Sequence, residues 1–368
     1  MTHSFTDMIK KTAAVISAAA ITAFTALPVS AEQPEQPEND PAYYVQVSDP
    51  PHVVFLGDSI TAGYGLDGYS PDDLYHCDSY ANILSRTFGE TLPEKAGFTA
   101  VNKAKDGTTS EGMLNKLRSG DLDEDLGSAD AVIMSIGGND LLDTFLELFG
   151  KDDGVSGTVS RVLSLSRDLD EKLKGFEKNL PLIANELHMR ADGAKIFVQT
   201  LYNPMESTAI SKLNEMSDEK IDKLNSIIRD CSRDGTMYTV VDIAGPFEGR
   251  SEELTNIGKY DIHPNAEGHA EIAKLMLTAV ESTEYSYYDV EAALRAKIEE
   301  LEASMSEQDE KISQLTAELE KTELERLRAE NKSRSISIAL ICTGAVLLLT
   351  AISWLTVGLI GRKKKNSR

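Results

Sequence analysis

Residues 53–63 read V-V-F-L-G-D-S-I-T-A-G and decide the fold. Four apolar residues, Val53 to Leu56, predict a buried strand, and the Gly-Asp pair that follows predicts a turn into a helix. Ser59 would then lie at the carboxyl end of the strand, where open α/β sheets bind their ligands. A serine at the start of a helix can attack a carbonyl while its own N–H helps to hold the oxyanion. Taken alone, the motif is also consistent with a simple helix N-cap.

The alternation of apolar strands and amphipathic helices continues to about residue 283. Short runs rich in Val and Ile predict strands, and longer stretches with a helical apolar period predict the helices between them. This order predicts one parallel sheet with helices on both faces, an α/β fold. The expected strands are 53–56, 98–102, 131–136, 195–200 and 237–242, and the expected helices are 79–88, 110–117, 159–190, 217–232 and 266–281.

Two further loops place polar groups at the same edge of the sheet. The segment N-K-A-K-D-G-T-T-S puts Gly107 after the second strand, and a glycine lets its backbone N–H come close to a ligand. The segment S-I-G-G-N-D puts Asn139 at the end of the third strand. An amide side chain is a neutral donor suited to a developing alkoxide. Both residues are therefore candidates for binding an oxyanion.

The last loop carries a histidine to the same edge. The segment Y-D-I-H-P-N-A-E-G-H covers residues 260–269, and Pro264 fits the first position of a helix. His263 therefore lies in the loop before that helix, again at the carboxyl edge of the sheet. Four loops that converge on one rim indicate a single site, although each motif is weak by itself.

In these four blocks, and over roughly residues 53–283, the sequence resembles the SGNH, or GDSL, family of serine esterases and lipases. The resemblance implies a flavodoxin-like three-layer α/β/α sandwich with a parallel sheet. It also implies an acyl-ester substrate and no metal or organic cofactor. By resemblance, the nucleophile is Ser59, the general base is His263, the oxyanion hole is formed by Ser59, Gly107 and Asn139, and the supporting residues are Asp58 and Asp140.

One position departs from the pattern of the family. The acid that orients the histidine usually lies three residues before it, where this chain has Tyr260. Asp261 lies two residues before His263, and we expect it to orient the imidazole and stabilise its charged form. The alternative is that a backbone carbonyl orients the ring, which would leave a Ser–His dyad.

The substrate stays open because an apolar cluster follows Asn139. It could form a lid or acyl-chain wall, which would imply a lipid or other long-chain ester. It could instead be an extra helix packed on the core, which we favour because clustered Leu and Phe are usually buried; a small acyl group, such as acetyl on a glycan, would then fit. Two alternative functions are a catalytically inactive SGNH-like surface binding protein and an acyltransferase that uses the same acyl-enzyme. The cluster comprises Leu141, Leu142, Phe145, Leu146, Leu148 and Phe149.

The charge is unevenly distributed along the 368 residues. The net charge is −23, but residues 32–289 carry −25 and the last eight residues carry +5. Such acidity argues against nucleic acid as a partner, because phosphate binding needs clustered Lys and Arg. The basic tail directly follows residues 336–360, which contain no charge and are long enough to span a bilayer. Positive flanks stay cytoplasmic, so we expect a single-pass cell-membrane protein with an extracellular catalytic domain and a cytoplasmic C-terminus.

We expect the remaining segments to export this domain and to hold it away from the membrane surface. Two lysines, an apolar run and Val29-Ser30-Ala31 predict a signal peptide, with an uncleaved anchor as the alternative. A heptad seam predicts a coiled coil that makes the protein a possible homo-oligomer, the alternative being one amphipathic helix that folds back on the domain. We expect Cys77 and Cys231 to be free thiols. The expected parts are a signal peptide (1–31), a Pro/Glu-rich linker (32–50), the SGNH hydrolase domain (51–285), a coiled-coil stalk (288–333), a transmembrane helix (336–360) and a basic tail (361–368).

Overall fold

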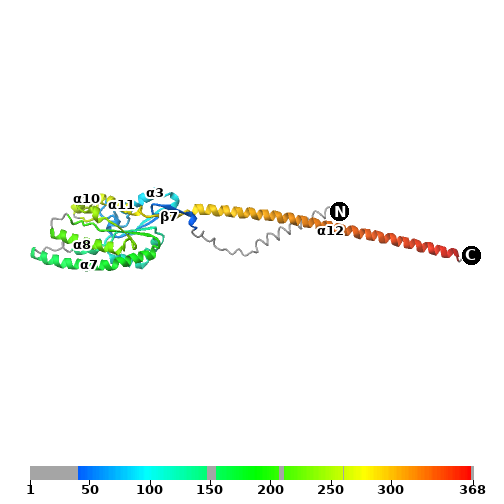
Figure 1. Cartoon of the computed structure of the whole chain (residues 1–368), viewed down its shortest axis with the longest axis horizontal. Coiled ribbons are helices and arrows are strands. Elements are labelled where there is room, and N and C mark those ends of the chain that lie inside the picture. The colour runs from blue at the N-terminus through cyan, green and yellow to red at the C-terminus, as the bar shows by residue number, and fades with distance from the viewer. Residues whose placement is uncertain (1–39, 147–154, 207–210, 260, 366–368) are drawn as a thin grey trace. The chain divides into compact units, whose positions relative to one another are not determined.

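The computed structural model describes residues 40–146, 155–206, 211–259 and 261–365. The chain divides into two compact units, Met1–Val290 and Glu291–Arg368. The first unit holds the sheet and the helices around it (Figure 1). The predicted signal peptide lies outside the described residues.

A five-stranded parallel sheet forms the centre of the first unit, in the order β3-β2-β4-β5-β6. All five predicted strands are confirmed. Their spatial order is the flavodoxin-like one: the chain adds its second strand on one side of the first strand and all later strands on the other side. This change of side falls between β2 and β4, whose carboxyl ends carry Ser59 and Asn139. The strands are β2 (His52–Leu56), β3 (Thr99–Asn102), β4 (Ala131–Met134), β5 (Lys195–Gln199) and β6 (Thr239–Val241).

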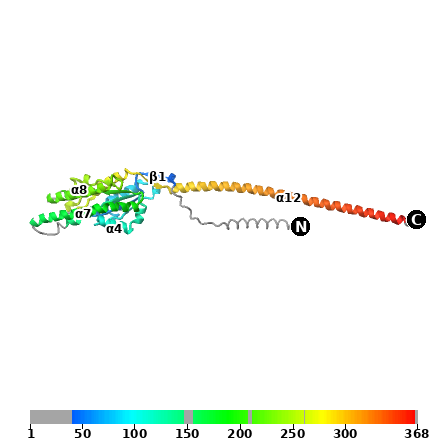
Figure 2. The ribbon, with the colours of Figure 1, turned by 60° about the horizontal axis from the view of Figure 1, so that its bottom comes forward.

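The helices cover both faces of this sheet, which gives the predicted three layers (Figures 1 and 2). Side chains alternate along each strand, so Val54 and Leu56 face one core while Val53 and Phe55 face the other. The first core is closed by α4 (Ser110–Ser119), α5 (Asp123–Gly127), α7 (Val155–Arg190) and α8 (Ser211–Cys231), and the second by α3 (Tyr80–Thr91), α9 (Ala244–Phe247) and α11 (Ala266–Val280). The other helical elements of this unit are η1 (Pro41–Tyr43), α2 (Ser59–Ala62), η2 (Glu94–Ala96), α6 (Gly138–Leu146), α10 (Ser251–Leu254) and η3 (Ile257–Lys259).

A second, two-stranded sheet was not predicted from the sequence. Strand β1 (Tyr44–Val47) pairs antiparallel with β7 (Tyr285–Tyr288), and the rings of Tyr44 and Tyr288 lie 5.4 Å apart, centroid to centroid. Part of the range predicted as linker, 32–50, is therefore regular structure. These strands are short and lack an apolar run, and each finds its partner about 240 residues away, so local sequence gives little sign of them.

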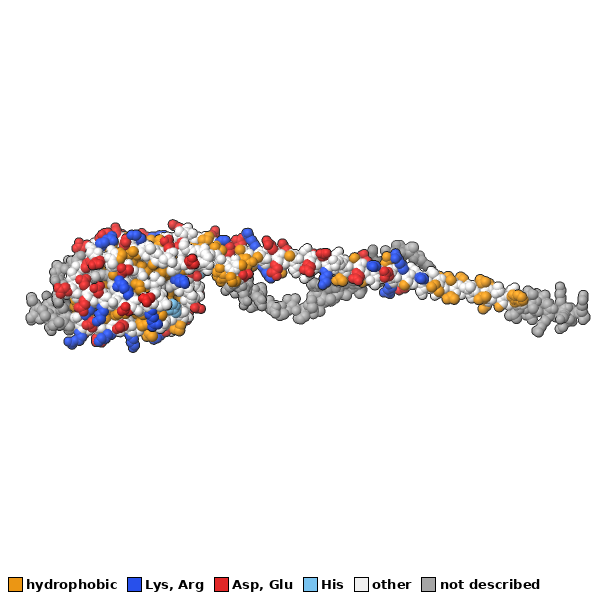
Figure 3. Space-filling model, viewed as in Figure 1, with side chains coloured by type: hydrophobic (Ala, Val, Ile, Leu, Met, Phe, Trp, Pro, Cys, Tyr) orange, Lys and Arg blue, Asp and Glu red, His pale blue; other side chains and the backbone are white. Residues whose placement is uncertain are grey.

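The predicted stalk and membrane span form one continuous helix, α12 (Val290–Lys365). Residues 290–335 of this helix carry mixed charges, and residues 336–354, which follow, carry none (Figure 3). Among the described residues, this is the one helix long and apolar enough to cross a membrane, with a mean hydropathy of 2.3 in its most apolar part. The apolar seam of the first half is more than half exposed: Leu294, Ile298, Leu301, Met305, Ile312, Leu315 and Leu319.

His269 on α11 is buried in this fold. Its ring stacks on Tyr80, and its Nδ1 accepts a hydrogen bond of 3.2 Å from the Tyr80 N–H. Burial, helped by the nearby charge of His263, lowers the pKa of His269 from 6.5 to about 3. Between about pH 3 and pH 6.5, therefore, the ring is neutral in the folded protein and protonated in the unfolded chain.

We expect His269 to make the protein less stable in mild acid. Its contribution to stability is complete above pH 6.5 and is lost as the pH falls towards 3, by up to about 1.4 kcal/mol per pH unit. Burial raises the pKa of Asp58 and Asp140, which acts in the opposite direction, but a His269→Asn variant keeps both. Urea unfolding at pH 7 and pH 5 should show a smaller loss of stability in His269→Asn than in the wild type. Equal losses would contradict a neutral buried imidazole.

Candidate active site

Ser59 begins helix α2 directly after strand β2. The chain turns sharply at Gly57, whose φ of +136° is a conformation that other residues rarely adopt. A Cβ at Gly57 would come within 2.5 Å of the Ser135 carbonyl oxygen, so the site also has no room for a side chain. Asp58 caps the helix by accepting a 3.1 Å hydrogen bond from the Ile60 N–H. This turn fixes the position of the Ser59 hydroxyl at the carboxyl edge of the sheet.

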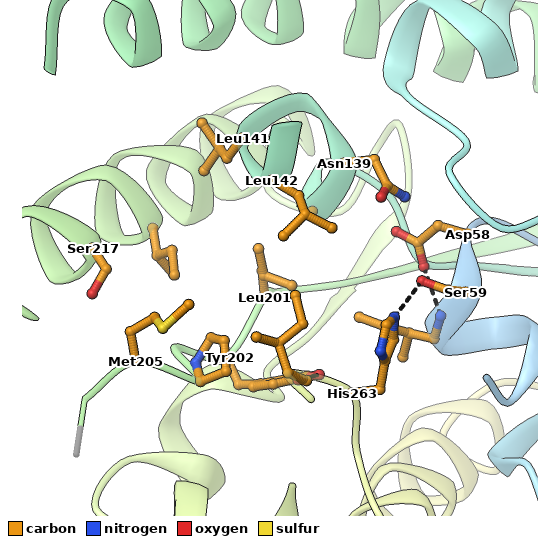
Figure 4. Close-up of a pocket in the computed structure, with 15 residues that line it drawn as sticks. Asp58, Ser59, Asn139, Leu141, Leu142, Leu201, Tyr202, Met205, Ser217 and His263 are labelled. Atoms are coloured by element: carbon orange, nitrogen blue, oxygen red, sulfur yellow. Dashed lines mark hydrogen bonds between the residues drawn. The ribbon is translucent and has the colours of Figure 1, made fainter. Parts of the chain in front are cut away.

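The structure brings Ser59, His263 and Asp261 into one hydrogen-bonded chain. His263 Nε2 lies 2.9 Å from Ser59 Oγ, and His263 Nδ1 lies 2.5 Å from Asp261 Oδ1 (Figure 4 shows the first of these contacts). Asp261 Oδ1 also accepts a 3.1 Å hydrogen bond from the His263 N–H. The backbone between the two residues therefore folds into a tight turn, which is why an acid two positions before the histidine reaches its ring. Tyr260, at the family's usual position, lies outside the described residues.

The partners of the imidazole determine its tautomer. A carboxylate can only accept a hydrogen bond, so Nδ1 carries the proton that faces Asp261. Nε2 is then left with its lone pair and accepts the Ser59 hydroxyl proton. This is the arrangement in which a histidine can deprotonate a serine as the serine attacks.

Two residues that sequence reasoning missed hold this loop. The ring of Tyr64 packs on the His263 imidazole, with 4.5 Å between ring centroids. The backbone of Asn256 brackets the turn, because its N–H donates to the His263 carbonyl at 2.9 Å and its carbonyl accepts from the Asp261 N–H at 3.3 Å. Neither residue belongs to one of the four sequence blocks, and no pattern in the sequence points to them.

Asn139, in the first turn of α6, contacts the loop that contains Gly107. Asn139 Nδ2 donates a 3.2 Å hydrogen bond to the carbonyl of Thr108, which ties the start of α6 to the loop that contains Gly107. Gly107 has a φ of +72°, and no described side chain or backbone atom crowds the position where its Cβ would be. Asn139 also lines the cavity beside Ser59 and His263. Asn139 thus lies beside Ser59 in the cavity wall and also against the loop that contains Gly107.

Asp58 and Asp140 are both buried and hold loops in place. Asp58 Oδ1 accepts a 2.6 Å hydrogen bond from the Ser135 hydroxyl, which joins the ends of β2 and β4. Asp140 accepts from both the N–H and the hydroxyl of Ser110, at 2.9 and 2.5 Å, which joins α6 to α4. Burial raises the pKa of each carboxyl group. Neither residue is hydrogen-bonded to His263 in the described structure.

A small apolar cavity of about 60 Å³ opens beside the hydrogen-bonded chain. Asp58, Ser59, Asn139 and His263 lie at one end of it, and apolar side chains lie at the other (Figure 4). Leu141 is buried in the core and also lines the cavity. The start of the predicted apolar cluster therefore belongs both to the core and to the cavity wall. The side chains of Phe145, Leu146, Leu148 and Phe149 lie outside the described residues. The apolar lining consists of Ile60, Leu141, Leu142, Leu201, Tyr202, Pro204, Met205, Ile221 and Ile262.

Comparison with known proteins identifies one matching family, a sequence relative and several similar structures. The model of the GDSL-like lipase/acylhydrolase family matches residues 55–271. The uncharacterized protein YpmR of Bacillus subtilis is 28% identical over 233 residues, which cover 62% of this chain and 82% of that protein. Similar solved structures include a lipase from a goat rumen metagenome (21% identity, TM-score 0.49, 62% of this chain and 96% of that one). Another is an acetylxylan esterase from Geobacillus stearothermophilus (19% identity, TM-score 0.43, 62% and 93%).

Proposed function

Because the chain belongs to the GDSL-like lipase/acylhydrolase family, we propose that it is a serine carboxylic ester hydrolase that works through an acyl-enzyme on Ser59. The observation that carries this proposal is the hydrogen-bonded chain from Ser59 through His263 to Asp261. The small apolar cavity beside it suits the acyl group of an ester.

The reaction follows from this geometry in two steps. His263 Nε2 takes the hydroxyl proton as Ser59 Oγ bonds to the ester carbonyl carbon, and Asp261 stabilises the imidazolium that results. The C–O bond to the alcohol then breaks, and His263 gives its proton to the leaving oxygen. A water molecule repeats the sequence on the acyl-enzyme, with His263 again as base, and releases the acid and free Ser59.

The negative charge that develops on the carbonyl oxygen needs donors in place beforehand. The Ser59 and Gly107 N–H groups and the Asn139 side-chain amide are our candidates for this oxyanion hole. Asn139 is supported by its position in the cavity wall next to Ser59. Gly107 is supported by the uncrowded space around its Cα and by the hydrogen bond from Asn139 to the neighbouring Thr108 carbonyl.

The two alternative functions differ in what the serine does. An inactive binding protein has no need for a serine, a histidine and an acid within hydrogen-bond reach of one another, so this geometry favours an enzyme. An acyltransferase would pass the same acyl group to an alcohol instead of water. Comparing free acid with transferred product in the presence of an acceptor alcohol would distinguish transfer from hydrolysis.

We propose that α12 anchors the protein in the cell membrane with its C-terminus in the cytoplasm and the catalytic unit outside. The charge-free stretch from residue 336 and the basic residues 362–365 support this orientation. The exposed apolar seam of its first half suits pairing with a second copy in a parallel coiled coil. Cross-linking of the full-length protein in membranes would detect such pairing, and a monomer at every concentration would exclude it.

The test of the proposed activity is hydrolysis of p-nitrophenyl esters of increasing chain length by the full-length protein in detergent. We expect p-nitrophenol release that depends on Ser59 and declines from acetyl and butyryl to long chains, because the cavity of about 60 Å³ has little room. The Ser59→Ala variant controls for background hydrolysis. A preference for long chains would contradict the small acyl site, and a lack of any Ser59-dependent release would favour the binding protein.

A further inference from the structure

A second and much larger cavity shares helix α2 with the acyl site, since Ser59 and Ile60 line the small cavity and Ala62 lines the large one. Its volume is about 790 Å³, which is within the range of about 300–1,000 Å³ for small-molecule sites. It is lined by Ala62 of α2, by the loop from Tyr69 to Tyr75, and by the loop from Asn102 to Asp106 that leads into Gly107. We call this cavity the tyrosine groove, after Tyr69 and Tyr75.

Two ring contacts connect the tyrosine groove to the hydrogen-bonded chain. Tyr69 in the groove packs edge-on against Tyr64, with 5.4 Å between ring centroids. Tyr64 in turn packs on the His263 imidazole at 4.5 Å. The leaving alcohol takes its proton from His263, so the alcohol part of an ester binds on the side of that imidazole. The groove begins one ring away from it.

The chemistry of the tyrosine groove suits a neutral, polyhydroxylated molecule. Tyr75 is 56% exposed and presents its ring to solvent, and aromatic faces pack well on the C–H faces of sugars. Three lysines and three aspartates balance each other, so the groove lacks the net positive charge that would select an anionic head group. These six residues also offer both hydrogen-bond donors and acceptors at the rim: Lys103, Lys105, Lys116, Asp72, Asp73 and Asp106.

The lining of the groove is held in place before any ligand binds. Tyr69 donates a short hydrogen bond to Asp106, and the Asn102 N–H donates to the Tyr75 hydroxyl at 3.3 Å. Lys116 Nζ donates to the Lys103 carbonyl at 2.8 Å, and Lys103 pairs with Asp125 at 2.9 Å. A prearranged lining reduces the entropy lost when a ligand binds.

Because this large cavity, lined by tyrosines and balanced charges, lies close to a small apolar one, we propose that the substrate is a carbohydrate that carries a short acyl ester, with its sugar in the tyrosine groove. This inference rests on the proposed esterase activity and names the substrate class. The small cavity takes the acyl group and the large cavity takes the alcohol. A lipid ester would need the reverse, with a large apolar site for the acyl chain.

The test compares two esters that share an acyl group and differ in the alcohol. The full-length protein, in a detergent without sugar, is assayed on acetylated xylo-oligosaccharides and on p-nitrophenyl acetate. Tyr75→Ala should lower kcat/KM for the oligosaccharide at least tenfold, mainly through KM, and at least fivefold more than for p-nitrophenyl acetate. Tyr44→Ala, an exposed tyrosine on β1, is the matched control and should leave both values within twofold. Equal losses on the two esters would overturn the proposal, as would preferred cleavage of dihexanoylphosphatidylcholine.

A binding measurement keeps this inference separate from the proposed activity. Calorimetric titration of Ser59→Ala with the same oligosaccharide should give a dissociation constant at least tenfold lower than for the Ser59→Ala, Tyr75→Ala double variant. Binding that depends on Tyr75 without any turnover by the wild type would refute the esterase and leave the carbohydrate site intact. No binding, or binding that ignores Tyr75, would refute the carbohydrate site whether or not p-nitrophenyl acetate is cleaved.

Discussion

Ser59→Ala should lower kcat for ester hydrolysis by about 10⁴- to 10⁶-fold, since loss of the nucleophile of a serine triad costs about that much. The reason is that His263 then has no hydroxyl to deprotonate, and only the oxyanion donors and substrate binding remain. The measurement is the initial rate of p-nitrophenyl acetate hydrolysis under saturating conditions. The effect should lie in kcat with little change in KM.

The Ser59→Ala variant should remain folded, because within the described part of the chain the hydroxyl is hydrogen-bonded to His263 alone, and the Cβ carbon stays. Thermal unfolding should therefore match the wild type closely. Ser119→Ala is a matched control that removes an exposed hydroxyl from the last residue of α4, and its activity should be unchanged. A Ser59→Ala protein that kept more than a tenth of the wild-type rate would exclude Ser59 as the nucleophile.

Asp261→Ala should lower kcat at least tenfold and by as much as about 10⁴-fold, which is the cost of replacing the triad acid by its amide in a serine protease. Asp261 holds both the ring and the backbone of His263, at 2.5 and 3.1 Å, so its loss frees the imidazole and removes the charge that stabilises its protonated form. The measurement is the same esterase assay, with circular dichroism to verify folding.

The matched control for Asp261 is Asp67→Ala, which removes an exposed carboxylate of the loop after α2. Its activity should stay within twofold of the wild type. Near-full turnover in a folded Asp261→Ala variant would mean that a backbone carbonyl orients the ring and that Ser59 and His263 work as a dyad.

The parts of the fold with strong local patterns were predictable. Each strand of the parallel sheet is a short apolar run, and the blocks with Ser59, Gly107 and Asn139 each follow such a run, so this part of the rim could be placed without coordinates. His263 was placed by Pro264, which marks the start of the last helix. Strands β1 and β7 were not predictable, because their tyrosines pair across most of the chain and give no local signal. Short strands that pair over a long sequence distance leave no periodic hydrophobic pattern in the sequence.

The site was predictable in its residues and less so in its geometry. The sequence placed Asp261 near His263 but left open whether a two-residue separation allows contact, because the answer depends on the backbone turn between them. Tyr64 and Asn256 act through a ring contact and two backbone hydrogen bonds that only the folded loops create. The sequence also offered a cavity wall and a packed helix as alternatives for the apolar cluster, but Leu141 belongs to both the core and the cavity wall.

The most direct test of the serine mechanism is covalent trapping of the nucleophile. The full-length protein is incubated with a fluorophosphonate, which reacts with serines that a neighbouring base activates, and the modified peptide is identified by mass spectrometry. We predict one adduct per chain, on Ser59, that is absent in Ser59→Ala and forms more slowly in Asp261→Ala. A folded protein that gains no adduct, or gains it on a residue other than Ser59, would contradict the account.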